Sequence, residues 1–164
     1  MGVVIERKFL LANDGWQGLG TPTLMRQGYL AADPVRTVRV RIEGERAVIT
    51  VKGKSTGARR GEWEYEIPVP DAAELLDGLC EQPLVEKIRH RIAHGGHVWE
   101  VDEFLGQNAG LVVAEIELGA EDEAFDKPAW IGREVTGEKR YYNASLVRLP
   151  YSQWEDRSSD APRA

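Results

Sequence analysis

The chain has 164 residues, a length typical of one domain that buries a hydrophobic core without disulfides or a structural metal. Its 21 basic and 27 acidic residues give a net charge of −6, which argues against a general nucleic-acid or membrane-surface binder, because both partners are polyanions. Cys80 is the only cysteine, so no intramolecular disulfide can form. Residues 1–6 lack the apolar core of a signal peptide, and no apolar run is long enough to span a membrane, so we expect a soluble, cytoplasmic protein.

Short runs rich in Val, Ile, Trp and Tyr alternate with Gly, Pro and Asn turn signals, a pattern typical of β-strands. The very short connections at 44–45 and 94–97 favour antiparallel hairpins. The predicted strands span residues 3–11, 24–31, 36–43, 46–54, 61–68, 84–93, 97–104 and 111–118.

Few helices are expected between and after these strands. Asp71 as an N-cap, with Glu74 three residues later, predicts one helix, and helical turns are expected near 120–125 and 134–147. From Ser152 onward the chain is polar and without periodicity, so we expect a domain over 1–151 and a flexible tail over 152–164. Trp130 and Trp154 fall in a predicted loop and in this tail, where they would mark a self-association patch.

Charge on the predicted strands follows a period of two, which places like charges on one face of each strand. The alternate positions are mostly apolar or aromatic. The basic faces carry Arg39 and Arg41, then Lys52 and Lys54, then Lys87, Arg89 and Arg91. The acidic faces carry Glu62, Glu64 and Glu66, then Glu100 and Asp102, then Glu115 and Glu117, while the first strand has Glu6 and Lys8 on one face.

A sheet with one face in water explains most strands that alternate in this way. Here each strand is of nearly one sign, and neighbouring like charges destabilise a sheet unless something binds between them. Because about eight antiparallel strands can close a barrel, we predict a mainly β fold, a closed eight-stranded antiparallel barrel with its charged faces inward. Helices, or a second copy of the chain in a homodimer, would cover the apolar outer faces. The interior would bind a ligand with several negative charges, together with divalent metal on the carboxylate side.

The stretch Ile5-Glu6-Arg7-Lys8-Phe9-Leu10 resembles the opening Glu-x-Glu-x-Lys signature of the CYTH superfamily, also called triphosphate tunnel metalloenzymes. The resemblance implies an eight-stranded tunnel and metal-dependent hydrolysis of a triphosphate, with Mg²⁺ or Mn²⁺ as cofactor. The short bacterial members, which are most similar, hydrolyse inorganic triphosphate. Further matches follow in order at 27–30, 39–41, the strand of Lys52, 62–66, 85–89, 99–104, 114–118 and 139–143.

The same resemblance implies roles for individual residues. Lys8 and Tyr29 match a pair that works near the scissile phosphate. The implied triphosphate-binding residues are Arg39, Arg41, Lys52, Lys87 and Arg89, with Lys139 and Arg140 on a C-terminal helix that plugs the tunnel. The implied metal ligands are Glu6, Glu115 and Glu117, with Glu62, Glu64, Glu100 and Asp102 as further acidic tunnel positions.

Val4 departs from the signature, which has a glutamate at this position. In the family that glutamate helps to hold the metal that activates the attacking water, so its loss would leave binding intact and reduce turnover. Two rival functions therefore remain open beside hydrolysis, a non-hydrolytic triphosphate or nucleotide binding module and an adenylate cyclase. Residues 4, 6 and 8 share a strand face, so we expect Val4 to project into the tunnel beside Glu6.

Overall fold

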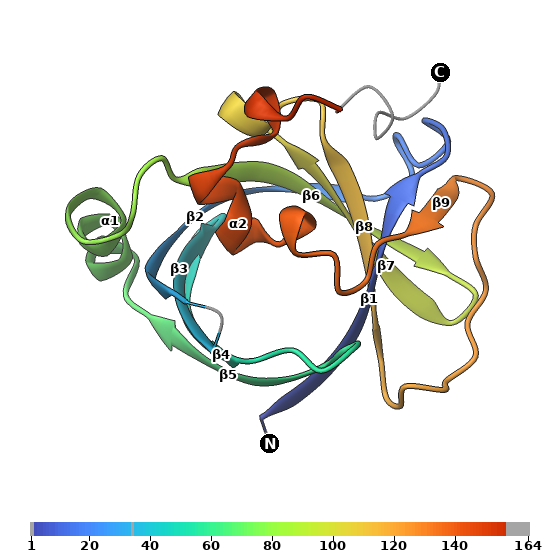
Figure 1. Ribbon diagram of the computed structural model, residues 1–164, viewed down its shortest axis with the longest axis horizontal. Helices are drawn as coiled ribbons and strands as arrows, with labels where there is room; N and C mark the ends of the chain where they lie inside the picture. The colour runs from blue at the N-terminus through green and yellow to red at the C-terminus, as the bar shows by residue number, and fades with distance from the viewer. Residues whose placement is uncertain (1, 34, 157–164) are drawn as a thin grey trace.

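A computed structural model describes residues 2–33 and 35–156, which form a nine-stranded antiparallel sheet whose first eight strands close into a barrel (Figure 1). The barrel order is β5-β4-β3-β2-β6-β7-β8-β1, and pairing of β1 with β5 closes the ring, which confirms the predicted eight-stranded fold. The strands are β1 (Val3–Leu11), β2 (Thr21–Ala32), β3 (Arg36–Glu43), β4 (Arg46–Gly53), β5 (Arg59–Ile67), β6 (Val85–His94), β7 (His97–Phe104), β8 (Val112–Leu118) and β9 (Ile131–Glu134).

The seam of the barrel lies along β1. One edge of β1 pairs with β8, and the other edge pairs first with β5 and then with β9, where the register shifts between Phe9 and Leu11. The observed bounds of β1, β3 and β7 are the predicted ones, whereas β2 begins at Thr21 and not at residue 24. The short strand β9 was not predicted, because its four residues, Ile-Gly-Arg-Glu, do not alternate between apolar and polar side chains.

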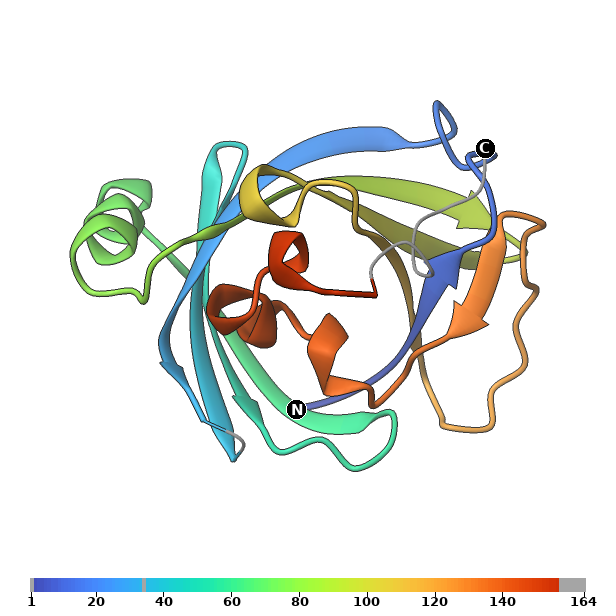
Figure 2. The same cartoon turned by 45° about the horizontal axis from the view of Figure 1, so that its top comes forward.

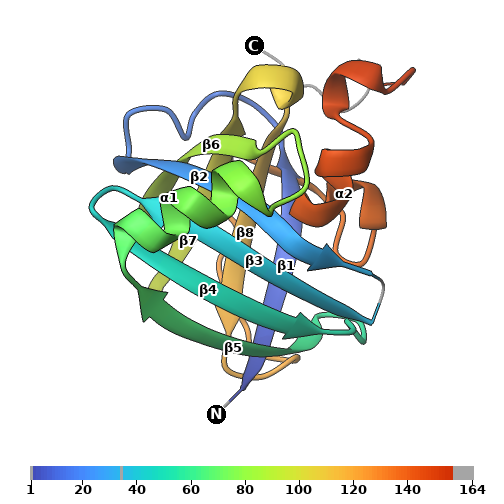
Figure 3. The same ribbon diagram turned by 90° about the vertical axis from the view of Figure 1, so that its left-hand side faces the viewer.

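Helix α1 (Val69–Gly78) covers the outer apolar face of β3 and β4 (Figure 3). Ala72 and Leu76 are buried against Val40 and Ala47 in one hydrophobic cluster. The predicted N-cap at Asp71 is wrong, because the helix begins two residues earlier and Asp71 lies within its first turn. Pro70 explains the earlier start, since proline lacks an N–H and has a φ angle suited to the first turn of a helix.

Two long loops cover the outer face of β1 and β6 to β8. Trp16 from the loop after β1 and Trp130 from residues 119–130 are both buried in the cluster that contains Phe9 and Trp99. The loop over 119–130 forms turns and extended chain, so the helical turn predicted near 120–125 is wrong. Trp130 covers the barrel and does not form the predicted self-association patch.

The C-terminal segment crosses the opening of the ring (Figure 2). It consists of a 3₁₀ turn η2 (Lys139–Tyr141), α2 (Asn143–Arg148) and a second 3₁₀ turn η3 (Tyr151–Gln153). Helix α2 contacts β2 and β6, and η3 packs on another 3₁₀ turn, η1 (Gly106–Asn108). Trp154 is buried between Tyr141 and Tyr151, so the predicted flexible tail and self-association patch are wrong at this residue. The sequence could not predict this packing, because a single tryptophan that packs over the barrel opening belongs to no periodic pattern. The predicted tail over 157–164 lies outside the described residues.

Among residues 2–33 and 35–156, none of the helices has the length and apolar character needed to cross a membrane.

Candidate triphosphate and metal site

Cations from two strands on either side of β2 face each other inside the barrel. Arg41 of β3 and Lys87 of β6 are 6% and 1% exposed, so neither charge is hydrated as it would be at the surface. Burial lowers the pKa of Arg41 to about 10, and the charges of Arg39 and Arg89 add to this effect. Burial also lowers the pKa of Lys87 to about 7, against the opposing charge of Asp102. The cations that perturb one another in this region are Arg39, Arg41, Lys87 and Arg89.

Two buried N–H donors of this cationic region have no hydrogen-bond acceptor among the described residues. They are the Nε atoms of Arg39 and Arg41. The Nε of Arg41 lies 3.3 Å from Oε2 of Glu43, but the angles do not make a hydrogen bond. Buried donors are nearly always satisfied in folded proteins, so water or the oxygen of a bound ligand would complete these two.

Asp102 holds two of the cations in place. Its Oδ2 accepts a hydrogen bond from Lys87 Nζ at 2.8 Å, and its Oδ1 accepts one from Arg89 Nε, also at 2.8 Å. Burial alone would raise the pKa of Asp102, but the charges and hydrogen bonds of Arg89 and Lys87 hold it well below its usual range. Both carboxylate oxygens therefore serve as a counter-ion, which argues against the metal-ligand role that the sequence suggested for Asp102.

The opposite wall of the barrel carries crowded carboxylates. Glu6 on β1 and Glu117 on β8 are paired directly across from each other. Glu115 lies two residues before Glu117 on the same strand. Burial raises the pKa of Glu6 to about 8, and the charge of Glu115 and a hydrogen bond between the two carboxyl groups add to the shift. Burial likewise raises the pKa of Glu117, with further contributions from Glu62 and Glu100. In this arrangement a proton or a cation at Glu6 would relieve the repulsion.

This donor set fits a hard divalent cation. Carboxylate oxygens are the ligands that Mg²⁺ and Mn²⁺ prefer, and a cation bound by Glu6 and Glu115 would neutralise their repulsion. Within the described part of the chain, no three acidic, histidine or cysteine side chains already form a complete metal cluster. Mg²⁺ commonly binds through one or two carboxylates plus substrate phosphates and water, so a pair of carboxylates on this wall would be enough for a site that a bound phosphate completes.

The remaining predicted acidic residues pair with cations inside the barrel. Glu62 Oε2 lies 3.3 Å from Lys52 Nζ, and Glu100 Oε2 lies 3.3 Å from Arg89 NH1. Glu64 accepts a hydrogen bond of 2.8 Å from the Thr50 hydroxyl. These three carboxylates separate and orient the cations, and their direct contact with metal stays a prediction.

Lys8 and Tyr29, the predicted catalytic pair, bond to different partners. Lys8 Nζ donates to the backbone oxygen of Tyr141 at 3.1 Å and lies 3.8 Å from Glu115 Oε1. The Tyr29 hydroxyl accepts a 3.4 Å hydrogen bond from Gln27 Nε2. Burial raises the pKa of Tyr29 despite the nearby charges of Arg39 and Arg41. Joint action of Lys8 and Tyr29 on a phosphate stays a prediction.

Lys139 and Arg140 lie on η2, before the C-terminal helix and not on it as expected. Lys139 is exposed. The Arg140 guanidinium pairs with Asp156 at 2.7 Å and lies 3.8 Å from the centre of the Trp154 ring. The structure therefore does not bring Arg140 together with the tunnel cations, and a substrate contact of either residue stays a prediction.

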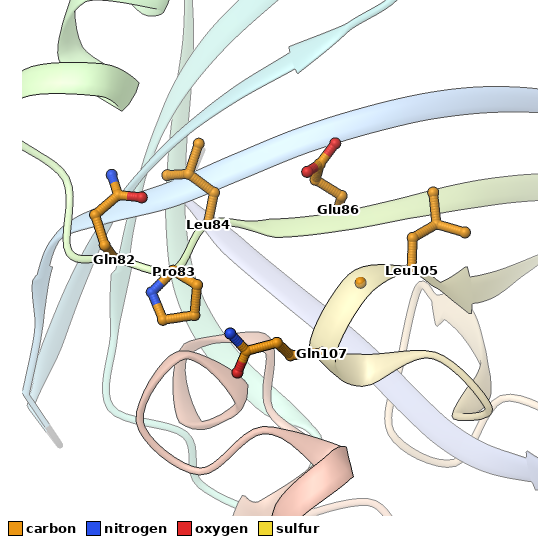
Figure 4. A pocket seen from close by; sticks show the side chains of 7 residues that line it. Gln82, Pro83, Leu84, Glu86, Leu105 and Gln107 are labelled. Atoms are coloured by element: carbon orange, nitrogen blue, oxygen red, sulfur yellow. The ribbon is translucent and has the colours of Figure 1, made fainter.

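Val4 is buried on the strand face that it shares with Glu6 and Lys8, and it pairs directly with Arg60 of β5. It lines a hollow of about 560 Å³ at this end of the barrel, together with Arg59 and Glu117. The signature position is thus apolar next to the acidic wall. A smaller hollow of about 280 Å³ lies beside β6 and contains none of the predicted site residues (Figure 4).

Sequence reasoning missed polar side chains that complete the interior. Gln27 is fully buried, and Asn143 reaches Lys87 from the first residue of α2. The Tyr142 ring lies under both Lys8 and Arg60, with cation-to-centroid distances of 5.5 and 5.9 Å. Only the position of Gln27, two residues before Tyr29 on β2, could have indicated an inward side chain.

Comparison with known proteins agrees with this geometry. Residues 3–151 match the CYTH domain family. The inorganic triphosphatase of Acetivibrio thermocellus is 51% identical over 156 residues, which cover 95% of this chain and 100% of that protein. The inorganic triphosphatase of Nitrosomonas europaea is 37% identical over 148 residues, which cover 87% of this chain and 95% of that protein. A crystal structure of an inorganic triphosphatase matches with a TM-score of 0.63 at 36% identity, covering 90% of this chain and 95% of that one. The chain therefore belongs to the CYTH family.

Proposed function

We propose that this chain hydrolyses inorganic triphosphate to diphosphate and phosphate with Mg²⁺ or Mn²⁺. The observation that carries the proposal is the pair of buried, inward arginine N–H donors that have no acceptor among the described residues. A ligand with many oxygen acceptors and several negative charges satisfies both the hydrogen bonding and the repulsion among Arg39, Arg41 and Lys87. Triphosphate has both properties.

The two walls of the barrel divide the chemistry. Arg39, Arg41 and Lys87 would bind and orient the phosphates, which fixes the reacting phosphorus near the acidic wall. Glu6, Glu115 and Glu117 would hold the divalent cation, which when bound neutralises phosphate charge and lowers the pKa of water. Lys8 lies 3.8 Å from Glu115, where its ammonium would stabilise charge on the leaving phosphate oxygen.

One observation favours a second candidate, a triphosphate-binding module with little turnover. Val4 offers no ligand at the position where the family signature has a glutamate, and it adjoins the Glu6 wall. Cations would still be available for binding, because Arg39, Arg41 and Lys87 do not depend on Val4.

Product analysis separates these functions. The protein is incubated with inorganic triphosphate, or with ATP, in the presence of Mg²⁺, Mn²⁺ or a chelator, and the products are separated by anion-exchange chromatography. We expect equal amounts of phosphate and diphosphate from inorganic triphosphate, and neither with the chelator. Tight triphosphate binding without products would support the binding module, and cyclic AMP plus diphosphate from ATP would identify a cyclase.

Matched variants link the activity to the interior. Arg41→Ala removes a buried cation, whereas Arg36→Ala removes an exposed arginine of the same strand whose partner is Asp33. Turnover should fall strongly only in Arg41→Ala. Equal loss in both variants, or in neither, would contradict the proposed site.

A further inference from the structure

Lys87 is a flexible side chain held at a fixed place inside the barrel. Its Nζ donates to Asp102 Oδ2 at 2.8 Å and to Asn143 Oδ1 at 2.9 Å. A lysine side chain has several rotatable bonds, so an ammonium that must meet a phosphate gains affinity when its position is set in advance. The two acceptors come from different parts of the fold, β7 and the start of α2.

The Asn143 amide is itself fixed from a second strand. Its Oδ1 also accepts a hydrogen bond of 3.0 Å from Gln27 Nε2, and Gln27 is fully buried on β2. One amide oxygen therefore joins β2, β6 and α2. Because this oxygen is neutral, it orients the Lys87 ammonium without cancelling the positive charge that an anionic ligand needs.

We propose that Asn143 is a positioning residue that holds the Lys87 ammonium toward the triphosphate. This inference rests on the proposed function, since it assumes that triphosphate binds among the interior cations. Without Asn143, the ammonium would bond to Asp102 alone, and the carboxylate would draw it away from a bound phosphate. The loss would therefore weaken triphosphate binding through Lys87 and through no other cation.

A purely structural role for Asn143 would be to dock the C-terminal segment onto the barrel. Docking also has contacts that do not involve Lys87, since Leu146 and Tyr151 pack in a hydrophobic cluster. The Tyr151 backbone N–H donates to Asn108 Oδ1 at 2.9 Å, and Asn108 is buried. Asn108→Ala therefore loosens the same segment and leaves the Lys87 contacts in place, which makes it a matched control.

The test is a double-mutant cycle read by calorimetric binding of inorganic triphosphate in the presence of a metal chelator. The proteins are the wild type, Asn143→Ala, Lys87→Met, the double variant and Asn108→Ala. We expect Asn143→Ala to weaken binding about tenfold, the size of one hydrogen bond to a charged group. In the Lys87→Met background the same change should alter affinity less than about twofold, because the residue it positions is gone. Asn108→Ala should bind like the wild type.

Two results would overturn the inference. One is a tenfold loss from Asn143→Ala that persists in the Lys87→Met background, and the other is an equal loss in Asn108→Ala. If Lys87→Met itself binds triphosphate like the wild type, then the proposed binding site fails, which is a distinguishable outcome. If Asn143→Ala does not fold by circular dichroism, Asn143→Leu keeps the branched shape of the side chain, removes the acceptor and takes its place in the cycle.

Discussion

Replacing Asp102 with Asn should reveal how strongly the interior cations depend on one buried carboxylate. The change keeps the shape of the side chain but removes the charge that faces Lys87 and Arg89, each at 2.8 Å. Breaking a buried ion pair from one side costs about 3–5 kcal/mol, and we expect about 3 kcal/mol because the amide still accepts one hydrogen bond. For a domain of this size, that loss lowers the unfolding temperature by about 6–12 °C.

The effect of inorganic triphosphate on the unfolding temperature of Asp102→Asn is a second measurement of the same dependence. Without the carboxylate, Lys87 and Arg89 repel each other, and a bound triphosphate would supply the missing negative charge. Inorganic triphosphate should therefore raise the unfolding temperature of Asp102→Asn more than that of the wild type. Mn²⁺ affinity in the presence of triphosphate should stay the same, because Asp102 is a counter-ion. A loss of stability below about 1 kcal/mol, or a large loss of Mn²⁺ affinity, would refute the reasoning.

The same substitution predicts a change in acid stability. The pKa of Asp102 is lower in the folded chain than its unfolded value of about 3.9, so its contribution is present above that value and is lost as pH falls through the folded pKa. Denaturant unfolding of the wild type should therefore lose stability on acidification below about pH 5, and Asp102→Asn should lose less over the same range. Parallel pH curves for the two proteins would contradict this assignment.

Three further predictions concern the acidic wall and the C-terminal segment. Val4→Glu adds a carboxylate beside Glu6, and it should raise the rate of phosphate release roughly a hundredfold with little change in triphosphate affinity. Equal rates in the two proteins would show that position 4 holds no catalytic metal. Glu117→Gln should weaken Mn²⁺ binding in the presence of triphosphate by calorimetry, and unaltered affinity would remove this residue from the metal site. Trp154→Ala removes a buried ring that packs on Tyr141, so denaturant unfolding should show a loss of about 3–5 kcal/mol, against a negligible loss if the segment were a free tail.

The barrel could be predicted because charged and apolar side chains alternate along its strands with a period of two. Alternation along β3 placed Arg39 and Arg41 on one face and Val40 on the other, and the structure has the two arginines inside and Val40 under α1. The same alternation placed Glu115 and Glu117 on one face of β8. A period of two reports which face a side chain occupies, so it found the composition of the interior.

Contacts made by chain segments without periodicity could not be predicted. The sequence around Trp154 is polar, and its burial depends on Tyr141 and Tyr151 meeting it over the barrel opening. Asn143 lies in the family-matched stretch 139–143, but its place in the sequence does not show that the fold brings its oxygen to Lys87. The pairing of opposite charges could not be predicted either. Alternation assigned Asp102 to an acidic strand face, but it did not show that both oxygens of this carboxylate bind Lys87 and Arg89.

Calorimetric titration of inorganic triphosphate, in a chelator, tests the central claim that the interior arginines form the binding site. The proteins are the wild type, a variant with both Arg39→Ala and Arg41→Ala, and the exposed control Arg36→Ala. Each interior arginine should contribute about 1.5–3 kcal/mol, the value of a hydrogen bond to a charged group, so the double variant should lose at least about a hundredfold in affinity. The control should bind like the wild type. Wild-type affinity in the double variant at the same salt concentration would contradict the account.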